Sequence, residues 1–188
     1  MKSAVRNIST REAILEATDR LLARYGYKKM TIDDLAAEVG IGKGSVYLHF
    51  SSKEEIALSH IDRIIERLKS NLRAIAARPA KADKRLKDML CERVLFRFDS
   101  VQHYTQNLND LLSAVRPKLL ERRKRYFAEE ARIIADIITE GQREGLFRDG
   151  SAADFAVTFL SATNSLLPYS LSVIELGNRD EVSDRVKK

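Results

Sequence analysis

The segment GIGKGS, residues 40–45, is the first place where residue types and spacing suggest ligand chemistry. A phosphate-binding loop requires Gly-Lys followed directly by Ser or Thr, and here Gly44 intervenes. Such loops also follow a β-strand, whereas this segment follows a helical pattern, and its spacing is not the Gly-x-Gly-x-x-Gly of dinucleotide sites. The segment therefore indicates a turn between helices and not a nucleotide site.

Residue types that carry enzymatic or metal chemistry are scattered. His49, His60 and His103 include no pair at the spacing of metal ligands on one helix, and no Gly-x-Ser-x-Gly elbow occurs. The single cysteine, Cys91, lies in an apolar helical pattern, which indicates a buried thiol and not a redox sensor. We therefore expect no metal, no cofactor and no enzymatic activity.

Side chains that suit a polyanion follow the glycine segment. A cation, hydroxyl groups and an imidazole, with no carboxylate among them, come from Lys43, Ser45, Tyr47 and His49, with Lys53 just beyond. The formal net charge of +6 also favours a polyanionic partner, although charge alone is weak support.

Three short helices are predicted to position these side chains. Ser9 and Glu12 have capping-box spacing at the start of the first helix, which ends at Gly26; Thr31 and Asp34 repeat the device for a second helix ending at Gly40. A third helix runs from about residue 43 to 49, with Val46 and Phe50 facing inward. Two short helices joined by a glycine-containing turn, braced by a preceding helix, form a helix-turn-helix.

The rest of the chain is also predicted to be helical, because only eight Gly and three Pro occur in 188 residues. A long amphipathic helix follows from 52 to 78, and further helices are expected near 82–98, 103–115, 117–144 and 151–176, with Pro117 in a first helical turn. The fold class is therefore all-α, with a break in organisation near residue 53.

Residues 31–55, TIDDLAAEVGIGKGSVYLHFSSKEE, resemble the TetR family of transcriptional regulators, and the resemblance reaches back to about residue 9. Beyond this part only helix count, length and the segment 138–148 are similar. The resemblance implies an N-terminal three-helix DNA-binding domain with a helix-turn-helix over 1–53. It also implies a larger C-terminal helical ligand-binding and dimerisation domain over 54–188, with about nine helices in total.

The resemblance also implies roles for individual residues. Contacts to DNA phosphates are implied for Thr31, Tyr47 and Lys53, entry into the groove for Lys43, Gly44 and Ser45, and a backbone contact for His49. A missing side chain at Gly44 would let the backbone approach the bases closely. Alternatives are that the Tyr47 ring packs against the first helix and that His49 only covers a core edge.

Broad apolar faces occur in the last two long helical segments. The resemblance implies that these helices pair with their symmetry mates as a four-helix bundle, with an expected dimer interface at Ile133, Ile134, Ile137, Phe155, Phe159 and Ala162. An ordinary intrachain core is the alternative for part of this set. The basic run 122–125 is expected to be a solvated helix face.

Effectors of the family bind among the middle helices, which implies an apolar ligand site with a few polar groups. The candidate ligand-binding residues are Met89, Arg93, Phe96, His103, Tyr104, Asn107, Asn164 and Tyr169. Aromatic residues at helical spacing are, however, more often core than pocket.

The predicted function is a repressor that binds double-stranded DNA at a palindromic operator as a homodimer and is released by a small hydrophobic or amphipathic ligand. No N-terminal apolar run follows Met1 and Lys2, and no stretch approaches the roughly 18 apolar residues of a membrane span, so a cytoplasmic protein is expected. The rival interpretations are a helical interaction protein without a DNA target and a small-molecule enzyme using a cavity among the middle helices.

Overall fold

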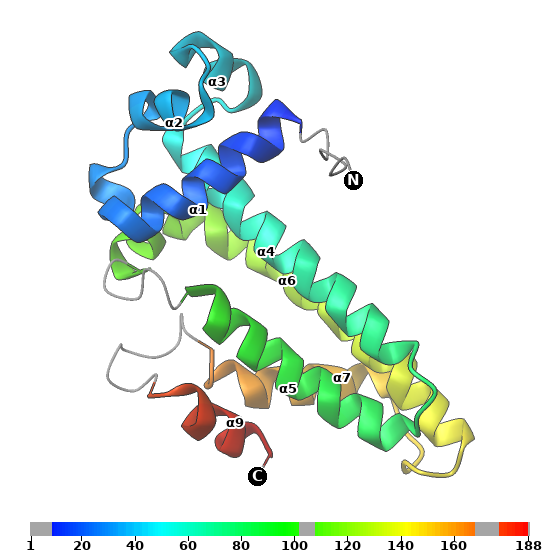
Figure 1. Cartoon of the computed structure of the whole chain (residues 1–188). Helices are drawn as coiled ribbons and strands as arrows, with labels where there is room; N and C mark the ends of the chain where they lie inside the picture. Colours follow the sequence, from blue (N-terminus) through cyan, green and yellow to red (C-terminus); the bar gives the residue numbers. More distant parts are fainter. Residues whose placement is uncertain (1–8, 102–107, 168–176, 188) are drawn as a thin grey trace, which may run out of the picture.

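A computed structural model describes residues 9–101, 108–167 and 177–187, and this part of the chain contains helices and no strand (Figure 1). The helices are α1 (Thr10–Lys29), α2 (Ile32–Val39), α3 (Lys43–His49), α4 (Lys53–Ala76), α5 (Ala82–Val101), α6 (Leu108–Arg143), α7 (Ala152–Asn164) and α9 (Arg179–Lys187). The prediction of an all-α fold is confirmed. Among the described residues, no helix is long and apolar enough to cross a membrane.

Local capping signals predict most bounds of the first three helices, but α1 continues past the expected stop at Gly26 to Lys29. The Ser9 hydroxyl accepts a hydrogen bond from the Glu12 amide at the start of α1, and Gly26 interrupts helical geometry near its end with a φ of 72°. At the start of α2, Thr31 and Asp34 form the predicted reciprocal capping box. Gly40 then ends α2 in the left-handed conformation, which a residue without a Cβ adopts without strain.

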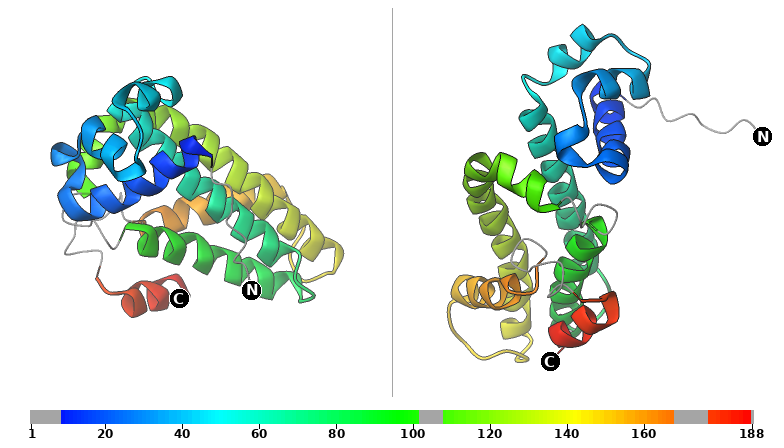
Figure 2. Two further views of the ribbon diagram at one scale, coloured as in Figure 1. Left: turned by 45° about the horizontal axis from the view of Figure 1, so that its top comes forward. Right: turned by 90° about the vertical axis from the view of Figure 1, so that its left-hand side faces the viewer.

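The long helices form an elongated body below this three-helix head (Figures 1 and 2). Helices α4, α5 and α6 contact one another, and α7 packs against α6. Their shared core includes Leu68 and Leu72 of α4, Met89 of α5, Ile134 of α6 and Leu160 of α7, all 0% exposed.

Helix α6 differs from the sequence prediction. We expected separate helices over 103–115 and 117–144, but one helix runs from Leu108 to Arg143 with Pro117 inside it. A proline inside a helix removes one backbone hydrogen bond and costs about 3 kcal/mol. Burial of Leu111 and Val115, each 2% exposed, in the core that includes α1 offsets this cost.

The end of the predicted helix 151–176 also differs. Helix α7 ends at Asn164, and the segment 168–176 lies outside the described residues. The buried Leu167 follows that end and packs with Val94 and Phe98 of α5.

One hydrophobic core joins the head to the body. It contains Ile14 and Leu22 of α1 together with Ile56 of α4 and Leu108 and Leu111 of α6. A change in the position of α6 near these leucines therefore bears directly on the helix that braces the helix-turn-helix.

Candidate nucleic-acid interface and ligand cavity

Helix α3 presents one buried and one open face. Val46 is 0% and Phe50 3% exposed, and both anchor the helix in the head core. Tyr47 is 50% exposed, and the side chains of Lys43 and His49 are also open to solvent, whereas Ser45 is half-buried. The exposure of Tyr47 and His49 argues against the alternatives in which they serve only the core.

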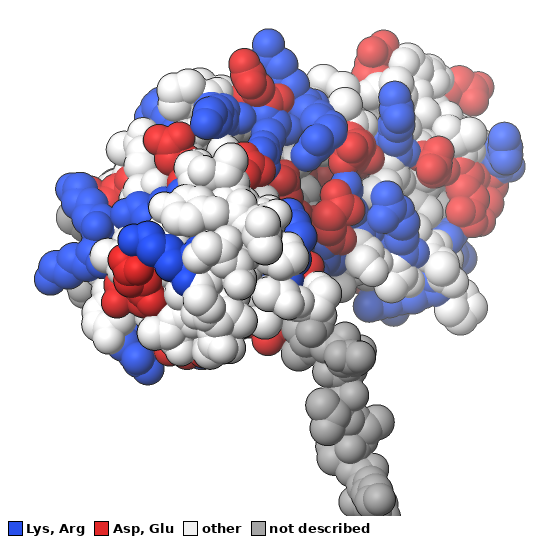
Figure 3. Space-filling model, turned by 90° about the horizontal axis from the view of Figure 1, so that it is seen from above, with Lys and Arg blue, Asp and Glu red and all other residues white. Residues whose placement is uncertain are grey.

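The turn before α3 leaves space for a close approach. A Cβ placed on Gly44 would meet no atom within 4 Å, so nothing within the chain requires a glycine there. Figure 3 looks down on the end of the molecule formed by α2 and α3, where basic side chains surround an uncharged patch with acidic side chains among them. The surface is open and mixed in charge.

A carboxylate lies beside the predicted cation of this surface. Lys43 Nζ is 2.8 Å from Asp33 Oδ2, and this hydrogen bond raises the pKa of Lys43. The side chains of α3 themselves include no carboxylate, but the fold brings Asp33, in the first turn of α2, next to Lys43. A DNA group that accepts from Lys43 would have to displace or share this partner.

Two other candidate DNA contacts also serve the head's own structure. The Thr31 hydroxyl accepts from the Asp34 amide at 3.1 Å and donates to the Asp34 carboxylate at 2.7 Å. Lys53 Nζ donates to the carbonyl oxygens of Tyr27 at 2.9 Å and Met30 at 3.0 Å, and so fastens the start of α4 to the end of α1. Their contacts to phosphate stay predictions.

Known proteins are similar to this chain in the sequence of the head and in the overall fold. A sequence profile described as bacterial regulatory proteins of the tetR family matches residues 14–59. The fold of the whole chain is similar to that of a TetR/AcrR-family transcriptional regulator from Thermobifida fusca, with a TM-score of 0.71, 21% identity and coverage of 94% of this chain and 93% of that chain. Residues 14–59 therefore carry the sequence pattern of the TetR family.

Two relatives with a similar sequence are named transcriptional regulators. The HTH-type transcriptional repressor KstR2 of Mycobacterium tuberculosis is 26% identical over 162 residues, which cover 82% of this chain and 78% of KstR2. The HTH-type transcriptional regulator EthR of the same organism is 33% identical over 72 residues, 38% of this chain and 33% of EthR.

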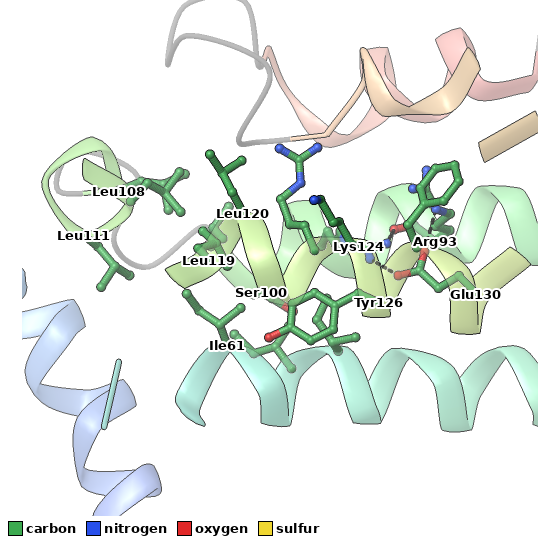
Figure 4. A pocket seen from close by; sticks show the side chains of 17 residues that line it. Ile61, Arg93, Ser100, Leu108, Leu111, Leu119, Leu120, Lys124, Tyr126 and Glu130 are labelled. Carbon is green, nitrogen blue, oxygen red and sulfur yellow. Dashed lines mark hydrogen bonds and ion pairs between the residues drawn. The ribbon is translucent and has the colours of Figure 1, made fainter. Parts of the chain in front are cut away.

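The body contains a partly open cavity of about 800 Å³ bounded by α4, α5 and α6 (Figure 4). Most of its wall is apolar, and includes Ile61 and Ile64 of α4 with Leu108, Leu111 and Leu120 of α6. The volume falls within the roughly 300–1,000 Å³ of small-molecule sites.

Charged side chains meet at one end of the cavity. Glu130 Oε2 accepts from Arg93 Nε at 2.8 Å, and its other oxygen accepts from Arg97. Glu130 and Arg93 are each 1% exposed and Arg97 is 7% exposed. Burial alone raises the pKa of Glu130, but the charges of Arg97 and Arg93 lower it by more, so Glu130 is held as a carboxylate.

The structure brings only part of the predicted ligand set to this cavity. Arg93 lines it, and Asn164 Oδ1 accepts from Arg93 Nη2 at 2.7 Å. Met89 is instead a fully buried core residue, and Phe96 borders a separate pocket of about 260 Å³. The other four candidates, His103, Tyr104, Asn107 and Tyr169, lie outside the described residues.

Sequence reasoning named Arg93 as a ligand residue but missed Arg97, Glu130 and the wall that α6 contributes. The available signal was a pair of arginines four residues apart in α5, Arg93 and Arg97, together with Glu130 at an inward position of α6. Charges on an otherwise apolar helix face are costly unless they pair or bind a ligand, so such residues indicate either a buried ion pair or a ligand site.

The basic run 122–125 is not merely a solvated face. Arg122 Nη2 lies 2.9 Å from both carboxylate oxygens of Glu55, and Arg122 also pairs with Asp62. Arg125 Nη2 is 3.2 Å from the same Asp62, and the Tyr126 hydroxyl donates to it. These contacts fasten α6 to the first half of α4, because the two helices run side by side.

The predicted dimer interface is divided by the fold. Ile133, Ile134 and Ile137 are 8%, 0% and 3% exposed inside the body core, so the intrachain alternative applies to them. Phe155 is half-buried, and the Arg148 guanidinium lies 4.9 Å from the centre of its ring. Phe159 is 39% exposed and Ala162 is also exposed, because both face away from α6.

Cys91 is half-buried, and burial raises the pKa of its thiol. The thiol is therefore protonated near neutral pH, a state that reacts slowly with oxidants.

Proposed function

We propose that this protein is a repressor that binds a palindromic operator as a homodimer and releases it when a small hydrophobic or amphipathic ligand fills the cavity. The observation that carries the proposal is the open face of α3 on a head of TetR type, joined through α4 to a wall of the cavity. KstR2, to which the chain is similar, is itself named a repressor. We place the protein in the cytoplasm, where such a regulator meets its DNA.

The DNA contacts are proposed to come from residues 1–53 as a DNA-binding domain, with residues 54–188 binding ligand and partner. Lys43, Gly44 and Ser45 would enter the major groove at the start of α3, while Tyr47 would reach a phosphate. Thr31, His49 and Lys53 would contact the DNA backbone on either side of the major groove. Hydroxyl, imidazole and ammonium groups donate hydrogen bonds to phosphate oxygens, and Thr31 and Lys53 would share their present partners with the phosphate.

A homodimer is proposed because one short recognition helix reads only a few base pairs. Two copies related by a two-fold axis would read half-sites about one DNA turn apart, roughly 34–36 Å. Exposed apolar side chains on α7, including Val157 at 43% and Phe159 at 39%, support an interface on that helix.

Helix α4 is the proposed connection between the ligand and the DNA. It begins at Lys53, directly after α3, and lines the cavity with Ile61, Ile64 and Ile65. In a dimer, the position of α4 would set the distance between the two DNA-binding heads. A ligand shifts the equilibrium between two such positions only by the difference in its affinity for them. A hundredfold preference corresponds to about 2.7 kcal/mol.

The proposal is tested by fluorescence anisotropy with the DNA upstream of the protein's own coding region, over a range of salt concentrations. We expect specific binding that weakens steeply with salt, because bound phosphates release counterions. Lys43→Ala should weaken binding and relax specificity at the base pair it contacts, and Tyr47→Ala should weaken binding to all sequences about equally. The matched control is Lys84→Ala on the exposed face of α5, which should bind like the unchanged protein.

Circular dichroism and sedimentation show whether a variant binds DNA weakly because it has lost a DNA contact or because it no longer folds or dimerises. Both head variants should keep the thermal transition and the dimer, since neither side chain is in the core. A monomeric protein, or equal binding by Lys43→Ala, Tyr47→Ala and the control, would refute the proposal.

A further inference from the structure

The cavity is polarised along its length. In Figure 4, Arg93 and Glu130 lie at one end, Leu108 and Leu111 lie at the other, and Ile61 and Leu119 lie between them. A ligand that fills the cavity therefore meets charge at one end and hydrocarbon at the other.

The charge at the polar end is unbalanced. Among the described residues that line the cavity, four are cationic and one is a carboxylate: Arg93, Arg97, Arg123 and Lys124 against Glu130. Glu130 accepts from both Arg93 and Arg97, which are almost fully buried, and Arg93 also donates to Thr163 and Asn164. Burying cationic groups is costly, and a bound anion beside them would lower that cost.

We propose that the cavity binds an elongated amphipathic anion, with a carboxylate or phosphate head group on an aliphatic chain. The head group lies near Arg97 and Lys124, and the chain runs along Ile61 and Leu119 towards Leu108 and Leu111. This inference rests on the proposed function, in which the cavity is the effector site, and adds the ligand's chemical class and direction.

The proposed orientation of the ligand connects the length of its aliphatic chain to the three-helix head of the protein. Leu108 and Leu111 belong to the core that contains Ile14 and Leu22 of α1, so the chain end of the ligand contacts the wall of that core. A longer chain displaces this part of α6 from α1, whereas a shorter one fills only the middle of the cavity. Ligand length is thereby sensed at the junction of body and head.

The ligand class is tested by titration calorimetry of the full-length protein without DNA. The probes are dodecanoate, dodecyl phosphate, methyl dodecanoate and dodecyltrimethylammonium, each below its micelle concentration. We expect at least one anion to bind about tenfold or more tightly than the neutral ester, because hydrogen bonds to a charged group add about 1.5–3 kcal/mol. The two anions distinguish a carboxylate site from a phosphate site, and equal or tighter binding of the ester or the ammonium compound overturns the proposal.

Variants locate the head group. Lys124→Gln should weaken anion binding several-fold, while Arg132→Gln, which removes the same charge from an exposed position of α6 outside the cavity, should not. Arg97→Met removes one buried cation from the cavity lining and should weaken binding of the anions while leaving binding of the ester unchanged. If Arg97→Met fails to fold, the comparison of Lys124→Gln with Arg132→Gln decides, and equal affinity in these two refutes the head-group position.

A chain-length series tests the direction. Octanoate, dodecanoate and hexadecanoate are compared in the unchanged protein and in Leu112→Phe, which narrows the end of the cavity away from Arg93. The variant should prefer shorter chains than the unchanged protein, and an unchanged order of affinities would overturn the orientation.

The same probes added to the protein–DNA complex separate this inference from the proposed function. Release of DNA by the anions that bind supports both. Anion binding without release overturns the effector role and leaves the ligand class intact, whereas release by the ammonium probe alone overturns the ligand class and leaves the repressor intact.

Discussion

Acid should destabilise this protein through His60, which α4 places against α1. The side chain is 1% exposed, and its Nε2 lies 3.6 Å from Asp19 Oδ1. Burial lowers the pKa of His60 from 6.5 to about 4, opposed by Asp19 and assisted by the positive charges of Arg63 and Arg67. The folded protein therefore holds a neutral imidazole at pH values where the unfolded chain is protonated.

The sign and size of the effect follow from proton linkage. Between pH 6.5 and about pH 4 the unfolded chain binds more protons at His60 than the folded protein, so stability falls as pH falls. The contribution of the buried neutral ring is complete above pH 6.5. With about 1.36 kcal/mol for each unit of pKa difference, the loss between pH 7 and pH 5 is about 2 kcal/mol.

Urea denaturation at pH 7 and pH 5, at one protein concentration, measures this loss. The unchanged protein should lose about 2 kcal/mol more than His60→Gln between the two pH values, because the variant has no ring to protonate. His49→Gln, which removes an exposed imidazole from α3, is the control and should keep the full pH dependence. Parallel losses in the unchanged protein and His60→Gln would show that the ring is not buried in a neutral state.

Three further substitutions test other parts of the structure. Glu130→Ala should cost about 3–5 kcal/mol in urea denaturation, since it leaves two buried guanidinium groups without their carboxylate; a loss below about 1 kcal/mol would contradict this. Thr31→Ala should lower the stability of the head by about 1 kcal/mol in thermal unfolding, because α2 loses its cap, and an unchanged transition would contradict the capping role. Asp33→Asn should tighten DNA binding a few-fold at low salt by freeing Lys43, and unchanged affinity in the anisotropy assay would remove Lys43 from the contact surface.

The sequence by itself determined the head. The bounds of α2 and α3 depend on Thr31, Asp34 and Gly40, whose effects act within a few residues. These bounds can therefore be predicted from the sequence without knowledge of the fold. Val46 and Phe50 were likewise assigned correctly to the inner face of α3, because helical periodicity fixes which side chains point the same way.

Only the tertiary structure decided what each face meets. Periodicity marked Ile133, Ile134 and Ile137 as apolar, but an intrachain core and a partner's surface require the same residue types, and the fold buried them within one chain. Local rules likewise predicted a helix boundary at Pro117, which burial of α6 overrode.

The cavity and its charges also required the fold. Glu130 lies 33 and 37 residues from its two arginines, and Lys43 lies ten residues from Asp33. Such pairs form because helices are brought side by side, and the energy of a charge depends on the partners and solvent that this arrangement leaves it. The sequence supplied the ionisable groups, and the packing of α4, α5 and α6 determined which of them line the cavity.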